Sequence, residues 1–219
     1  MTEARDAFGR RWTADIHPLG DQPSESYAHL SAAERFALVG ALQRRHARLV
    51  PSGRGGVPLR VREGGILRDP LDLLRILVAH EVRFLVIGAH ALAVHGLPRY
   101  TDDLDIWLES SKENAERAFA ALGEFGAPLA ELRITPADLT NGETVVQLGL
   151  PPNRIDLLST MLAVGSFSAA WLDRREAVID GLTVSFIGRA ALLANKRAVG
   201  RPQDLVDAQR LEALPPSGE

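Results

Sequence analysis

The sequence predicts an α/β protein with a small mixed sheet and flanking helices. Short apolar runs typical of strands alternate along the chain with longer amphipathic segments typical of helices. Glycine and proline turn signals separate many of these segments. The 219 residues are 46% hydrophobic, which is enough to bury a substantial core. Elements mixed in this order indicate one α/β domain with an appendage.

The chain divides into three parts, which we expect to be an extension at residues 1–64, a main domain at 65–214 and a tail at 215–219. Within the extension, residues 1–30 are rich in turn formers and are expected to be extended or loosely ordered. Ser31 with Glu34 forms a capping box for a helix that runs to about Leu49.

The apolar stripe of that helix must pack on the main domain, on a second copy of the chain or on a partner. The extension could therefore be an inhibitory segment, a dimerisation arm or an inert addition, and the sequence leaves all three open.

The first elements of the main domain follow from local signals. Pro70 suits the first position of a helix over 70–80, and the apolar run after it predicts a strand over 82–87. A short helix over 89–95 is closed by Gly96. A strand over 102–109 and a helix from Ser111 to residue 125 come next.

The second half of the domain continues the alternation. Residues 135–138 start a short helix, and strands over 144–150 and 154–158 are joined by Pro-Pro-Asn. Ser166 or Ser168 caps a further helix, and residues 182–187 form a strand. The chain then ends in two helices, over 188–199 and 202–214.

Asp103 and Asp105, separated by one leucine, are candidate metal ligands. Side chains at i and i+2 share one face of a strand, and the flanking apolar residues favour a strand here. Two converging carboxylates suit one or two Mg²⁺ ions. A solvated strand edge or a turn is the plainer interpretation, but the glycine turn upstream at Gly88 favours the metal site.

Asp156 is a third candidate. It is the lone acid in an apolar run over 154–158, and on a strand it would face away from Ile155 and Leu157. A buried carboxylate needs a cation or hydrogen-bonding partner. Arg154, on the same face, could be that partner, and a bound metal is the alternative.

The run GAHALAVHGLPRYTDDLDIW, residues 88–107, resembles the signature of the DNA-polymerase-β-like nucleotidyltransferase superfamily. That signature is a Gly-[Gly/Ser] turn, a short helix and then Asp-x-Asp on the next strand. His-Gly-x-Pro-Arg-x-Thr before Asp-Leu-Asp is similar to the AbiEii-type branch, which includes toxins of type IV toxin–antitoxin systems. The resemblance spans about residues 69–214 and implies the small mixed sheet of that superfamily with a C-terminal helical part.

The C-terminal region adds to the resemblance. AbiEii-like proteins carry a lysine followed by Arg-x-x-Asp-x-x-Asp, which Lys196, Arg201, Asp204 and Asp207 match. Lysine is a mobile point charge suited to phosphates, and arginine can form a forked contact with one. Asp204 could orient either cation. The alternative is an exposed helix terminus with charge pairs at i, i+3.

The resemblance places the nucleotide at Gly88, Ala89, Arg99 and Thr101 as well as at Lys196 and Arg201. The superfamily often has serine where this chain has Ala89, so a phosphate contact at that place must come from backbone N–H groups. Arg99 could meet the triphosphate or pair with Asp102. His90 and His95 are expected to be structural or adjacent to a phosphate, because they lack a third histidine for zinc.

The activity implied is Mg²⁺-dependent transfer of a nucleoside monophosphate from a nucleoside triphosphate to an acceptor hydroxyl. Asp103, Asp105, Asp156, Lys196 and Asp204 would be catalytic, and the three strand carboxylates would hold two Mg²⁺ ions. The implied acceptor is RNA, with the 3′ end of tRNA first, and the implied partner is a cognate antitoxin. A protein hydroxyl as acceptor, or a non-catalytic module that binds a nucleotide or a partner, are the alternatives.

Composition narrows the remaining classes. The absence of cysteine excludes disulfides and zinc–thiolate sites. No apolar run approaches the ~18 residues of a membrane span, and the N-terminus lacks the apolar core of a signal peptide, so we expect a cytoplasmic protein without a membrane partner. The net charge of −3 gives no general case for nucleic-acid binding.

Charge is nevertheless unevenly distributed. No acidic residue lies between Glu34 and Glu63, whereas arginine recurs at positions 44, 45, 48, 54, 60 and 62. This segment could hold an RNA backbone by charge. The favoured interpretation is a solvated linker after the helix.

Overall fold

The computed structural model describes residues 2–5, 11–14, 27–49, 70–101, 103–130, 132–143, 145–148 and 154–215. The expected Pro-Pro-Asn connection, Asp102, the arginines at positions 54, 60 and 62 and the end of the tail lie outside these residues.

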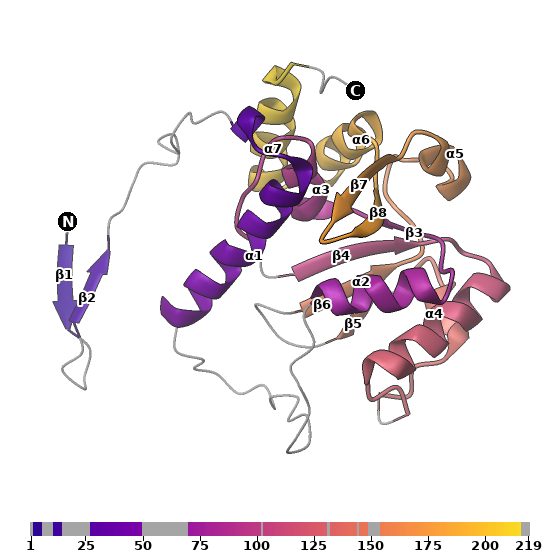
Figure 1. The fold of residues 1–219 in the computed structure, drawn as a ribbon. Coiled ribbons are helices and arrows are strands. Elements are labelled where there is room, and N and C mark those ends of the chain that lie inside the picture. Colours follow the sequence, from indigo (N-terminus) through magenta and orange to yellow (C-terminus); the bar gives the residue numbers. More distant parts are fainter. Residues whose placement is uncertain are drawn as a thin grey trace.

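A mixed sheet of six strands organises the described part of the main domain (Figure 1), which confirms the predicted fold class. Its strand order is β5-β6-β4-β3-β8-β7. The β4/β6 and β3/β8 pairs are parallel, and the β3/β4, β5/β6 and β7/β8 pairs are antiparallel. The strands are β3 (Phe84–Val86), β4 (Asp103–Leu108), β5 (Val145–Leu148), β6 (Arg154–Leu158), β7 (Arg175–Ile179) and β8 (Leu182–Phe186).

The helices surround this sheet, with α2 next to α4 and α6 next to α7 (Figure 1). They are α1 (Ala32–Leu49), α2 (Pro70–Ala79), α3 (Gly88–Val94), α4 (Lys112–Phe125), α5 (Phe167–Leu172), α6 (Arg189–Val199) and α7 (Pro202–Ala213), with short 3₁₀ turns η1 (Tyr27–His29) and η2 (Pro136–Leu139). None of the described helices is both long and apolar enough to cross a membrane.

Helix starts follow their predicted caps. Ser111 accepts from the backbone N–H of Asn114, and Ser166, rather than Ser168, accepts from that of Ala169. At α1, the Glu34 N–H donates to Ser31 Oγ at 3.2 Å, and the Ser31 N–H donates to Glu34 Oε2 at 2.7 Å. The predicted capping box is therefore confirmed.

The apolar stripe of α1 packs on the main domain. The Phe36 ring lies 5.0 Å from the His90 ring and 6.2 Å from the Phe186 ring, measured between centroids. Arg35 donates to the carbonyl of Val94 at 3.0 Å, at the end of α3. The first turns of α1 therefore pack on the main domain of the same chain, beside α3, which is one of the three surfaces considered for this helix.

Three strands, β7, β1 (Thr2–Arg5) and β2 (Arg11–Ala14), were absent from the predicted elements. β7 forms a hairpin with β8, and the turn residues Asp180 and Gly181 have φ of 50° and 77°. Asp-Gly between alternating runs is a strong hairpin signal because both turn positions need positive φ. β1 also pairs with β2 in the lead that was expected to be extended or loose.

Candidate active site

The glycine turn brings the main chain close to the acidic strand. Gly88 has φ of +61°, a conformation that glycine adopts without steric cost. A Cβ at this position would overlap Oδ2 of Asp105 and lie 2.9 Å from its Cγ. The start of α3 and the carboxylate on β4 thus share a space that only a glycine leaves open.

Three carboxylates converge beside this turn. In the parallel β4/β6 pair, Asp105 lies opposite Asp156 and Asp103 lies opposite Arg154. Oxygen atoms of Asp103, Asp105 and Asp156 all lie within 4.8 Å of one another. The strand pairing therefore gathers the three acids that the sequence singled out.

Arg154 holds two of these carboxylates. Its Nε donates to Asp156 Oδ1 at 3.0 Å, and its NH2 group is ion-paired with Asp103. The partner anticipated for Asp156 is thus present, and it also reaches the neighbouring strand. Thr101 Oγ1 donates to Asp103 Oδ1 at 2.6 Å and fixes the other side of that carboxylate.

Asp105 is the carboxylate whose pKa is most affected by this arrangement. Burial, followed by repulsion from Asp103 and Asp156, raises the pKa of Asp105 to about 7, against the opposing effect of Lys196 and Arg154. The pKa of Asp105 is therefore raised mainly because the group is buried, and the two neighbouring carboxylates add to the effect. Hard divalent cations suit a donor set of this kind.

A second group of charges lies on α6, α7 and the loop before β4. Lys196 Nζ lies 2.5 Å from Asp204 Oδ1 and 3.1 Å from Asp207 Oδ2. Asp207 also accepts from Arg99, whose NH2 lies 3.0 Å from Oδ2. Lys196, Asp204 and Asp207 are all buried, so the alternative of an exposed helix terminus does not hold for them.

Arg99 and Arg201 differ in how they are held. Arg99 is tied to Asp207, whereas its proposed partner Asp102 lies outside the described residues. Arg201 is 80% exposed and its Nε lies 4.0 Å from Asp204 Oδ2. Arg99 is therefore fixed in place, and Arg201 has room to turn toward a ligand.

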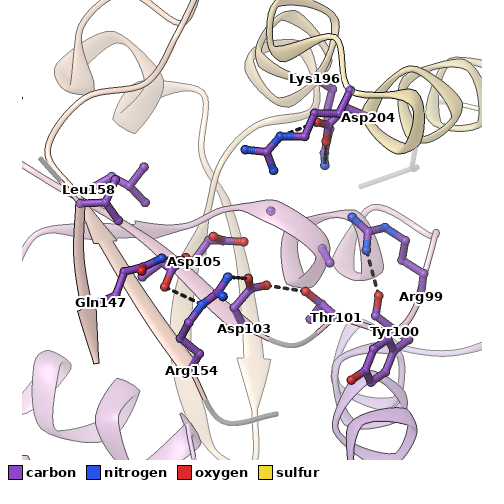
Figure 2. A pocket seen from close by; sticks show the side chains of 15 residues that line it. Arg99, Tyr100, Thr101, Asp103, Asp105, Gln147, Arg154, Leu158, Lys196 and Asp204 are labelled. Atoms are coloured by element: carbon purple, nitrogen blue, oxygen red, sulfur yellow. Dashed lines mark hydrogen bonds and ion pairs between the residues drawn. The ribbon is translucent and has the colours of Figure 1, made fainter. Parts of the chain in front are cut away.

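Apart from Asp207, the charged groups described above line one cleft of about 620 Å³ (Figure 2). Each residue that the sequence placed at a catalytic or nucleotide site lines it: Gly88, Ala89, Arg99, Thr101, Asp103, Asp105, Asp156, Lys196, Arg201 and Asp204. The roles assigned to them remain predictions, but their assembly in one cleft is a property of the structure.

Four further residues of the lining were assigned no role from the sequence: Tyr100, Val145, Gln147 and Leu158. Arg154, which also lines the cleft, was considered only as a partner of Asp156. Gln147 lies opposite Asp156 in the antiparallel β5/β6 pair, and its Nε2 donates to Asp156 Oδ2 at 3.2 Å. The alternation along β5 puts Val145 and Gln147 on one face. That pattern alone does not say which strand lies next to β5.

The two histidines are buried behind the turn. Burial lowers the pKa of His90 to about 4, and its Nδ1 has no hydrogen-bond partner within the described part of the chain. His95 Nε2 lies 2.8 Å from the carbonyl of Ile187. Of the two roles considered for these histidines, structural or adjacent to a phosphate, their contacts agree with the structural one.

No protein-family model matches the chain, and no curated protein matches its sequence. Among solved structures, the lincomycin-bound lincosamide antibiotic adenylyltransferase LnuA aligns over 66% of this chain and 95% of its own, with 13% identity and a TM-score of 0.45. The antibiotic-resistance factor ANT(2″)-Ia in solution aligns over 64% and 78%, with 14% identity and a TM-score of 0.42.

ANT(2″)-Ia in complex with adenylyl-2″-tobramycin aligns over 64% of this chain and 83% of its own, with 15% identity and a TM-score of 0.42. Similarities of this size leave the function of this chain to be inferred from the cleft itself.

Proposed function

We propose that this chain is a Mg²⁺-dependent nucleotidyltransferase, which moves a nucleoside monophosphate from a nucleoside triphosphate to an acceptor hydroxyl. One observation carries the proposal. Carboxylates from two adjacent strands, Asp103, Asp105 and Asp156, face a cleft whose lining also contains Arg99, Lys196 and Arg201. Metal-assisted phosphoryl chemistry needs both groups, one to hold cations and one to hold phosphates.

The three carboxylates fit Mg²⁺ by their chemistry, since all are hard oxygen donors and their oxygen atoms lie within 4.8 Å of one another. Asp103, Asp105 and Asp156 would hold the metal. When bound, Mg²⁺ supplies charge neutralisation at the α-phosphate and at the pyrophosphate that leaves.

The cations of the cleft would bind the nucleoside triphosphate. Lys196 is oriented by Asp204 and Asp207, and Arg99 by Asp207, so both are held before the ligand arrives. Exposed Arg201 would close onto the phosphates. Gly88 and Ala89 allow the triphosphate to approach the main chain, and Thr101 keeps Asp103 in place.

The reaction itself forms one bond and breaks one. The acceptor oxygen bonds to the α-phosphorus, and the bond from that phosphorus to the bridging oxygen of pyrophosphate breaks. The proton of the acceptor hydroxyl leaves toward Asp156, which lies at the edge of the cleft between Arg154 and Gln147.

For the acceptor we propose RNA, with the 3′ end of tRNA first. This follows from the resemblance to the AbiEii-type branch and from the arginine-rich segment over 44–62. A role as a toxin held by a cognate antitoxin, and a place in the cytoplasm, are parts of the same proposal. The same resemblance allows a protein hydroxyl as acceptor.

A non-catalytic binding module is the second candidate, and Arg154 is the observation that favours it. This guanidinium already pairs with Asp103 and Asp156, so it could neutralise them permanently where an enzyme would use metal. Such a module would bind nucleotide without releasing pyrophosphate.

The test is incubation of the protein with Mg²⁺, total tRNA and each α-labelled nucleoside triphosphate in turn, followed by RNase or protease. Label lost with RNase supports the RNA acceptor, and label lost with protease supports a protein acceptor. Nucleotide binding by calorimetry with neither label nor pyrophosphate would establish the binding module instead.

A further inference from the structure

The two sides of the cleft differ in charge. Arg99 and Lys196 lie on one side of Asp103 and Asp105, and Gln147 and Leu158 lie on the other (Figure 2). Arg154 also lies on the second side, but its charge is already paired with Asp103 and Asp156. A triphosphate carries several negative charges and is attracted to the side with the cations. The β5–β6 side is then left for the group that accepts the nucleotide.

Gln147 is placed to connect that group with Asp156. Its Nε2 donates to Asp156 Oδ2 at 3.2 Å, while Arg154 Nε occupies Oδ1 at 3.0 Å. An amide NH2 group has two N–H donors, so Gln147 can hold Asp156 with one and donate the other to the oxygen of a hydroxyl, whose own proton is then free to face Asp156. The side chain is exposed, whereas Asp156 is buried.

A shallow hollow of about 320 Å³ continues from the cleft on this side. Val145 and Gln147 line both, and the rest of the hollow is formed by Leu132, Arg133, Ile134, Asp138 and Val146. Leu132 and Val145 are each 48% exposed. The sheet edge at β5 therefore offers a path from solvent to Asp156 on which apolar side chains lie between the charged Arg133 and Asp138.

We propose that the acceptor binds across β5, with its hydroxyl held by Gln147 beside Asp156 and the uncharged group next to that hydroxyl packed on Val145 and Leu132. The proposal rests on the nucleotidyltransferase function above. For the RNA acceptor, the group in the hollow is the unpaired 3′-terminal nucleoside, because bases can pack on apolar side chains once they are unstacked. Gln147 is thus a positioning residue, and Val145 sets acceptor affinity.

The chain offers a matched control at the other edge of the sheet. Val145 on β5 and Val178 on β7 are exposed valines on the two edge strands, with exposures of 48% and 60%. Val145→Asp and Val178→Asp therefore introduce the same charge with similar effects on folding. Only the first lies beside the proposed acceptor path.

The experiment measures the KM for total tRNA and the KM for the nucleoside triphosphate separately, in both valine variants and in Gln147→Leu. We expect Val145→Asp and Gln147→Leu to lower kcat/KM for tRNA by about tenfold or more, with the KM for the triphosphate unchanged. Val178→Asp should match the wild type. An equal rise in the KM for the triphosphate, or wild-type kinetics in both β5 variants, would overturn the proposal.

Binding provides a readout that does not depend on turnover. The affinity of a short RNA ending in CCA, measured by fluorescence anisotropy, should fall in Val145→Asp and not in Val178→Asp, and equal affinities would contradict the β5 path. Absence of label in any acceptor with the wild type would refute the proposed function. An intact transfer to RNA with unaffected β5 variants would refute the acceptor path alone.

Discussion

Gly88 and Asp105 occupy adjoining space, so that a methyl group on the glycine would overlap the carboxylate. The turn after β3 and the acidic strand are therefore a single geometric unit, although they are separated in the sequence. Positive φ at Gly88 adds a second reason for glycine.

Gly88→Ala should therefore displace Asp105 as well as strain the turn. We expect a loss of about 2 kcal/mol in stability and a reduction of transfer by tenfold or more, measured by chemical unfolding and by label transfer. Gly126→Ala is the control, because Gly126 also has positive φ, 93°, but a Cβ there would meet nothing within 4 Å. Equal activity in the two variants would show that Asp105 does not depend on the glycine.

Asp105 should make the metal-free protein less stable as pH rises. Its folded pKa of about 7 lies above the ordinary value of 3.8, so between these values the unfolded chain loses a proton that the folded chain keeps. Stability falls through that window and the penalty is constant above it.

Asp105→Asn removes this penalty. In EDTA at pH 8 the free energy of unfolding of the variant should exceed that of the wild type by about 1–3 kcal/mol. Its melting temperature should be higher by roughly 2–4 °C for each kcal/mol, and the difference should vanish toward pH 4. Mg²⁺ should stabilise the wild type more than the variant. A variant that melts lower than the wild type at pH 8 would show that Asp105 is a stabilising group.

Lys196 should be more important for stability than an exposed cation of the same helix. Lys196→Met leaves Asp204 and Asp207 buried without their shared partner and should cost about 2–4 kcal/mol. Arg197→Met removes the exposed pair with Glu212 and should cost less than about 1 kcal/mol. Urea unfolding compares the two, and Asp204→Asn combined with Lys196→Met should recover part of the loss.

Phe36 tests whether α1 belongs to the main domain. Phe36→Ala removes a buried ring from beside His90 and Phe186 and should cost about 3 kcal/mol, whereas Leu38→Ala, at a partly exposed position of the same helix, should cost less. Both variants should unfold in one transition. A separate early transition for α1 in the wild type would mean that the helix is not part of the cooperative unit.

The parts of the site that local patterns determine were predictable. The common face of Asp103 and Asp105 and the position of Asp156 follow from the alternation of side chains along a strand. Outside the site, the caps at Ser111 and Ser166 were predictable for the same reason, because each side chain bonds to the start of its own helix. Strand pairing is not local, and so the place of Gln147 beside Asp156 could not be read from β5.

Ion pairs between residues far apart in the sequence could not be predicted for the same reason. Arg99 pairs with Asp207, which lies 108 residues away, while the sequence suggested only its near neighbour Asp102. The β7 strand was different, because its Asp-Gly turn was a local signal that the predicted elements omitted.

The most direct test of the central claim compares nucleoside triphosphates labelled at the α and at the γ phosphate, with Mg²⁺ and total tRNA, in the wild type and in Asp105→Asn. Nucleotidyl transfer predicts that the α label enters the acceptor and that the γ label leaves as pyrophosphate. With Asp105→Asn, no α label should enter the acceptor and no labelled pyrophosphate should be released. Label from the γ position in the acceptor, or equal incorporation by the variant, would contradict it.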